Sequence, residues 1–241
     1  MKTSIQRIPQ RAFTLVELLV VCALIAILIA LVTPVVAAIK ANTVSQGIYI
    51  VGDTLERARS YAMSMNTYVY VGIDQDSSSS AAGTMVIAVI ASNDSTQIFS
   101  NNSSLPPNST SFKAVGKLLK IDNLQTVSLS SKSQTSGSPR QVVPSSDKVG
   151  DPTFAVQSST SSPYSFWVGN YQFTSVPGAT STQGVSSEGI LQIDPQGVVS
   201  QVGGDAVPFF ELGMVPVHGN QLNFGAIQIA GLSGVVRIYR P

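Results

Sequence analysis

The chain has 241 residues, of which 44% are hydrophobic and only 11% are charged, and its formal net charge is +1. Soluble domains average about 25% charged residues, so this chain is unusually poor in charge. Nucleic-acid binders are usually basic, so a net charge of +1 gives no electrostatic support for a nucleic-acid partner in the bulk of the chain. With a single cysteine, Cys22, and a single histidine, His218, the chain forms no intrachain disulfide and no familiar His/Cys zinc site. We therefore expect neither a metal nor a cofactor.

The first segment is a basic leader followed by a long apolar run. Lys2, Arg7 and Arg11 precede an uncharged stretch from Leu18 to Ile39, which at about 1.5 Å per helical residue spans a hydrocarbon core of about 30 Å. The run is longer than the apolar region of a cleaved secretory signal. We expect a retained membrane anchor that crosses once, with the N-terminus cytoplasmic and the bulk of the chain exported.

Glu17 lies at the front of this apolar run. The dipole at a helix N-terminus partly stabilises a carboxylate there, so its position alone is compatible with an inert interfacial residue. An ionisable group in a membrane segment is equally a functional hypothesis that calls for a named partner.

The residues from Arg11 to Pro34 resemble the prepilin leader and first helix of type IV pilins and of type II secretion pseudopilins. The matching residues are Phe13, Thr14, Leu15, Glu17, Leu18 and Leu19. The resemblance implies that a prepilin peptidase cuts between Ala12 and Phe13 and then N-methylates Phe13. Ala12 stands where the family usually has Gly, and Pro34 falls where the family commonly has a proline that loosens the helix.

The resemblance also implies a partner for Glu17. Cleavage creates a free amine on Phe13, and in the family the glutamate meets the amine of a neighbouring subunit during assembly. Each charge alone is costly in an apolar bundle, and pairing offsets much of that cost. We expect this contact to set axial register between subunits.

Beyond the anchor, residues 40–66 continue the helix as an amphipathic segment. Its apolar positions are spaced alternately by four and three, which predicts one buried stripe: Val44, Ile48, Val51, Leu55, Ala58, Ala62 and Met65. We expect a single helix from Phe13 to Met65 whose stripe packs on its own domain.

Residues 67–241 are expected to form an extracytoplasmic β-rich domain. Segments rich in β-branched and aromatic residues predict strands at 67–73, 83–92, 164–173, 189–193, 197–202, 222–229 and 234–240. We predict a hairpin at 189–202 that turns at Asp194–Gly197, and a strand within 124–129. A Ser-rich insertion at about 130–163 is expected to be mobile, with a partner-binding loop as the alternative.

The fold class expected from these elements is α+β and pilin-like: a long N-terminal helix packed on an antiparallel sheet. The whole resembles the H-type minor pseudopilin of type II secretion and the FimT-like minor pilins. Three further stretches carry this resemblance: the Arg57–Ser60 stretch, the hairpin at Asp194–Gly197 and the terminal strand. It implies three partners: prepilin peptidase, other pseudopilins or minor pilins, and an inner-membrane assembly platform.

Two alternatives remain open. A DNA-binding minor pilin would use Arg237 and Arg240 on phosphates and Tyr239 on bases, although nucleic acid is the less expected partner. A signal-anchored periplasmic enzyme is the other, but the sequence contains no nucleophile elbow, Walker loop or His-Glu-x-x-His motif. We therefore expect a non-enzymatic structural subunit without catalytic residues.

Overall fold

The computed structural model describes residues 15–76, 83–99, 104–105, 109–129, 140–149, 151, 154, 164–175, 185–202, 204–218 and 223–240, without the side chains of residues 30–43 and 185–188. The chain divides into two compact units, Met1–Ile39 and Lys40–Pro241. A single helix, α1 (Leu15–Met65), passes from one into the other, as predicted. The predicted first helical residues, 13 and 14, lie outside the described residues.

Within the Lys40–Pro241 unit, the predicted stripe of α1 is buried from Val44 through Ala62. Met65 departs from the prediction, because 52% of its side chain is exposed. The reason is that α1 ends there: Asn66 adopts the left-handed conformation with a φ of 49°, and the amide of Thr67 donates to the carbonyl of Ala62 over 3.0 Å. A left-handed residue after the last turn is a common helix terminator.

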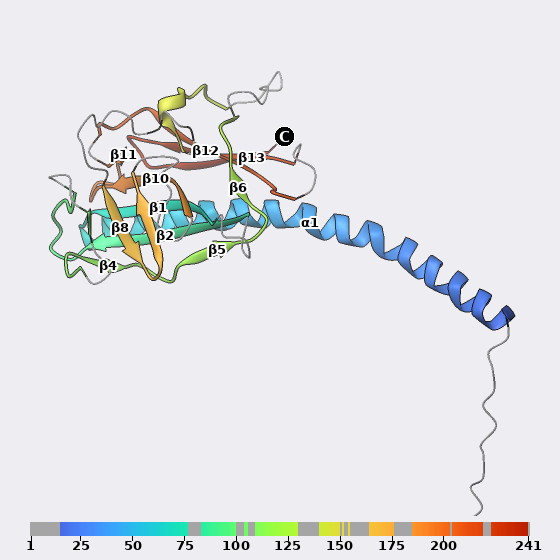
Figure 1. Ribbon diagram of the computed structural model, residues 1–241. Helices are drawn as coiled ribbons and strands as arrows, with labels where there is room; N and C mark the ends of the chain where they lie inside the picture. Colours follow the sequence, from blue (N-terminus) through green and yellow to red (C-terminus); the bar gives the residue numbers. More distant parts are fainter. Residues whose placement is uncertain are drawn as a thin grey trace, which may run out of the picture. The chain divides into compact units, whose positions relative to one another are not determined.

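Sheet A supplies one wall of the domain (Figure 1). Its strands run in the order β11-β10-β1-β2-β4, β5 also pairs with β2, and every pair is antiparallel. The strands are β1 (Val69–Asp76), β2 (Thr84–Ser92), β4 (Phe112–Ala114), β5 (Leu119–Ile121), β10 (Val185–Ile193) and β11 (Val199–Gln201). The predicted hairpin is confirmed: the amide of Gly197 donates to the carbonyl of Asp194 over 2.9 Å between β10 and β11.

Sheet C supplies the opposite wall. Its order is β14-β13-β12-β6, with β7 also pairing with β12 in parallel. The strands are β6 (Gln125–Thr126), β7 (Lys148–Val149), β12 (Phe209–Val215), β13 (Gly225–Ala230) and β14 (Val236–Tyr239). The sequence prediction missed β12, although its apolar residues Phe210, Leu212 and Met214 alternate. The intervening Glu211, a charged residue that is buried here, hides that pattern.

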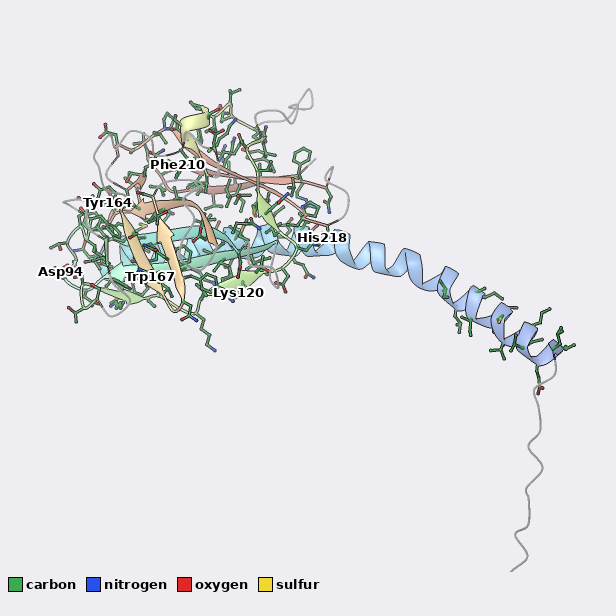
Figure 2. The ribbon with its side chains drawn as sticks, viewed as in Figure 1. Asp94, Lys120, Tyr164, Trp167, Phe210 and His218 are labelled. Atoms are coloured by element: carbon green, nitrogen blue, oxygen red, sulfur yellow. The ribbon has the colours of Figure 1, made fainter. Side chains whose placement is uncertain are left out.

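The first core lies among α1, sheet A and sheet C. One buried cluster contains the stripe of α1 from Val44 through Ala62, the β1 residues Val69, Val71 and Ile73, and the β12 residue Phe210. Figure 2 labels Phe210 on its strand. Burying such side chains contributes roughly 1.5–3 kcal/mol each, so the second half of α1 is an integral part of this domain.

A second core lies on the other face of sheet A. It is covered by sheet B, whose strands are β3 (Ser104–Leu105), β8 (Ser165–Val168) and β9 (Tyr171–Thr174). The predicted strand at 164–173 is thus a hairpin, β8–β9. Phe166 and Phe173 stack with ring centroids 5.2 Å apart, and a Cβ at Gly72 of β1 would stand only 2.6 Å from the Phe173 ring. Glycine at position 72 therefore allows sheet B to pack closely against sheet A. The predicted α+β, pilin-like arrangement is confirmed.

Candidate functional site

The N-terminal part of α1 is an apolar rod with one acid in its first turn. From Leu15 to Ile29 every side chain is exposed, including Leu15 at 80% and Leu18 at 62%. Glu17 lies in the first turn of the described helix, where the helix dipole favours a carboxylate. An apolar surface of this extent is normally covered by lipid or by other protein.

Some of the predicted site residues cannot be placed. Ala12 and Phe13 lie outside the described residues, so the predicted cleavage and methylation there stay predictions. Pro34 falls within α1, but its side chain is not among those described. In the part of the chain that the structure describes, no helix is long and apolar enough to cross a membrane.

The described residues of the Ser-rich insertion pack on the domain, and the mobility expected for the insertion stays a prediction. Residues 140–149 run along sheet C and include a 3-10 turn, η2 (Ser145–Asp147), followed by β7. Val149 is 1% exposed and Phe154 is fully buried, with the Phe154 ring centroid 6.4 Å from that of Phe210. These apolar side chains, set between serines and prolines, anchor the segment to the domain.

A buried ion pair fixes the start of this segment. Arg140 Nε lies 3.6 Å from Glu211 Oε2, and their side chains are only 9% and 3% exposed. Gln228 Nε2 donates to the same Glu211 oxygen over 2.8 Å. Gln228 also holds the Gln141 backbone, accepting from its amide over 3.1 Å and donating to its carbonyl over 2.7 Å. No local pattern predicts this pairing, because Arg140 and Glu211 are far apart in the chain.

The structure does not bring the three C-terminal residues proposed for DNA contact onto one surface. Val236 and Ile238 of β14 belong to the apolar side chains packed against the first core. Because successive strand residues face opposite ways, Arg237 and Tyr239 face away from α1. The Arg240 side chain instead points toward α1. Its Nη2 donates to Ser45 Oγ over 2.7 Å and to Asn223 Oδ1 over 3.1 Å. Arg240 therefore ties the end of the chain to α1.

His218 lies at the end of the domain where α1 enters it (Figure 2). Its backbone amide donates to Asn123 Oδ1 over 2.6 Å, and its carbonyl accepts from Asn123 Nδ2 over 3.1 Å. These contacts involve the backbone of His218 and hold its loop against the loop that carries Asn123. They explain the position of the residue without a catalytic role.

Three stretches singled out by sequence resemblance meet at the opposite end of the domain, where α1 ends. A Cβ at Gly197 would stand 3.0 Å from Arg59 Nε and 2.9 Å from Met63 Sδ, and one at Gly234 would stand 2.5 Å from Arg59 Nε. Both glycines have positive φ, 83° and 64°, which side chains rarely adopt. Arg59 thus lies between the β10–β11 turn and the β13–β14 turn. Sequence alone marked each stretch but not their contact.

Comparison with known proteins identifies the first part of the chain. Residues 7–33 match the model of the prokaryotic N-terminal methylation motif. No curated protein and no solved structure matches the chain. The motif implies processing by prepilin peptidase, anchoring in the inner membrane through the N-terminal helix, and assembly with pilins. The chain therefore carries a prokaryotic N-terminal methylation motif leading into a helix whose second half packs on antiparallel sheets, as in a pilin-like protein.

Proposed function

We propose that the protein is a structural minor pseudopilin of a type II secretion-like system. Prepilin peptidase removes residues 1–12 and methylates Phe13, and the N-terminal helix, residues 13–39, holds the chain in the inner membrane and then in the filament core. The observation that carries this proposal is the methylation motif at residues 7–33 continuing into an apolar helix whose described side chains are all exposed from Leu15 to Ile29.

Glu17 has a defined role in this proposal. Glu17 is the fourth residue after the new N-terminus at Phe13, so its carboxylate lies about one helical turn from that amine. Within a bundle of apolar helices, the Glu17 carboxylate of one subunit pairs with the Phe13 amine of the next. Pro34 eases the bending of the helix as the subunit leaves the membrane. The periplasmic domain, residues 67–241, then contacts neighbouring subunits.

A DNA-binding minor pilin is the competing function, and a signal-anchored enzyme is a more distant one. The separation of Arg237 and Tyr239 from Arg240 across β14 weighs against a joint phosphate site. No observation favours an enzyme over a structural subunit.

Deletion of the gene in the native host tests the proposal against the DNA-uptake reading. We expect secreted proteins to accumulate in the periplasm and to disappear from the culture medium, while transformation by added DNA is unchanged. Restoration of secretion by the intact gene is the control. Normal secretion together with lost transformation would favour the DNA-uptake pilin instead.

A further inference from the structure

Three exposed apolar residues lie close to Arg59 along the chain or in the turn that contacts it, at the end of the domain where α1 terminates. Met63 follows Arg59 by one helical turn, and Leu232 and Val235 flank Gly234, which lies against the Arg59 side chain. We call Arg59, Met63, Leu232 and Val235 the distal surface. The side chains of Met63, Leu232 and Val235 are 47%, 73% and 43% exposed. Isolated exposed apolar residues are ordinary, but three of them on two elements that meet at one arginine form a surface of the kind that marks an interaction site. Met and Arg are also enriched at protein interfaces.

Hydrogen bonds within the two adjoining turns hold the distal surface in shape. Asp194 Oδ1 accepts from the amides of Gln196 and Val198, each over 2.9 Å, which fixes the turn beneath Met63. In the other turn, the amide of Gly234 donates to the carbonyl of Ala230 over 2.6 Å. A surface that is already ordered loses little conformational entropy when a partner binds.

The charge of Arg59 points to the chemistry of the partner. The Arg59 Nε is buried and has no hydrogen-bond partner in the structure, and among the described residues no carboxylate lies within ion-pair distance of its guanidinium. The neighbouring Arg57, by contrast, pairs with Asp53 over 2.9 Å. A guanidinium beside exposed apolar residues favours a carboxylate, which it can bind through two parallel hydrogen bonds.

We propose that the distal surface docks a carboxylate-bearing apolar segment of another pilin-like subunit, so that a subunit lies beyond this one in the filament. The proposal rests on the proposed function, because that function places the domain in a filament. A lipid surface is the other kind of partner that binds a cation beside apolar residues. Within the Lys40–Pro241 unit, Met63 lies about 30 Å from Val44 along α1, at about 1.5 Å per residue, so the distal surface is at the C-terminal end of this helix.

A site-specific photocross-link in the full-length chain tests this in the native host. Leu232 is replaced by p-benzoylphenylalanine, and the matched control is the same replacement at Val142, which is 81% exposed outside the distal surface. We expect a light-dependent adduct from position 232 alone. Mass spectrometry should identify the captured protein as one with its own N-terminal methylation motif, joined through a segment that contains Asp or Glu.

Two further variants in the same strain link the adduct to the charge. Arg59→Gln should lower its yield about tenfold or more, as for an interface hot spot, whereas Arg57→Gln should leave it unchanged. Arg59→Gln also removes packing, so a second pair of variants at exposed positions is needed. Leu232→Asp should lower the amount of the captured subunit that co-purifies with the chain, whereas Val142→Asp should leave that amount unchanged. Equal adducts at 232 and 142, a lipid adduct, no adduct, or full yield with Arg59→Gln would each overturn the docking proposal.

The mature N-terminus is determined on the same preparation, which separates this proposal from the proposed function. A chain processed at Phe13 that gives no adduct contradicts docking alone. An unprocessed chain overturns the proposed function, and the docking proposal with it.

Discussion

Glu17→Leu should leave the protein in the inner membrane but reduce its incorporation into the filament at least about tenfold. Leucine makes the helix more apolar, so insertion is maintained. The substitution leaves the Phe13 amine of the adjoining subunit buried without its counter-charge. Removing one partner of a buried pair typically costs about 3–5 kcal/mol, and about 1.4 kcal/mol already corresponds to a tenfold change in an equilibrium constant.

The measurement is the fraction of the chain that co-purifies with sheared or detergent-extracted filaments. Glu56→Leu is the matched control, because Glu56 is exposed on the domain half of α1, and we expect it to assemble normally. Glu17→Asp should recover part of the incorporation, since it keeps the charge on a shorter side chain. Normal co-assembly of Glu17→Leu would contradict the proposed role of this carboxylate.

Arg140→Met should destabilise the Lys40–Pro241 unit by about 3–5 kcal/mol, because it leaves Glu211 buried without its cation. The carboxylate would retain the hydrogen bond from Gln228, but one neutral donor does not compensate a buried charge. A change of this size is a large fraction of the total stability of a domain. The Ser-rich segment would lose one of its contacts with β12 at the same time, while the pairing of β7 with β12 remains.

Arg57→Met is the control for this prediction. The Arg57–Asp53 contact is shorter, at 2.9 Å, but the two side chains are 79% and 56% exposed, so we expect a loss of about 0–1 kcal/mol. The two free energies of unfolding are compared by urea titration of the full-length protein in detergent, followed by the fluorescence of Trp167, the single tryptophan. The double variant Arg140→Met/Glu211→Gln should recover most of the loss. Equal small losses for both single arginine variants would show that the buried pair does not anchor the segment.

Local signals in the sequence were sufficient for much of the fold. The alternating spacing of Val44, Ile48, Val51 and Leu55 predicted both the helix and its buried face, because helical periodicity is a property of the chain itself. The turn at Asp194–Gly197 was predicted for the same reason: the Asp194 side chain and the glycine at positive φ act within four residues.

The misses have a common physical cause in contacts between distant residues. Glu211 interrupts the apolar pattern of β12, and its burial becomes intelligible only when Arg140 and Gln228 are seen beside it. The split of Arg237 from Arg240 follows from the pairing of β14 with β13 and its packing on α1. The meeting of Arg59 with Gly197 and Gly234 likewise depends on tertiary packing that no single stretch encodes.

The mass of the mature N-terminal peptide tests the central claim most directly. Protein purified from a host with its native prepilin peptidase should begin at Phe13 and carry one methyl group on its α-amine. The same chain from a peptidase-deficient host should retain Met1 to Ala12 and lack the methyl group. A mature chain that begins at Met1 in the native host, or beyond the apolar part of α1, would contradict the account.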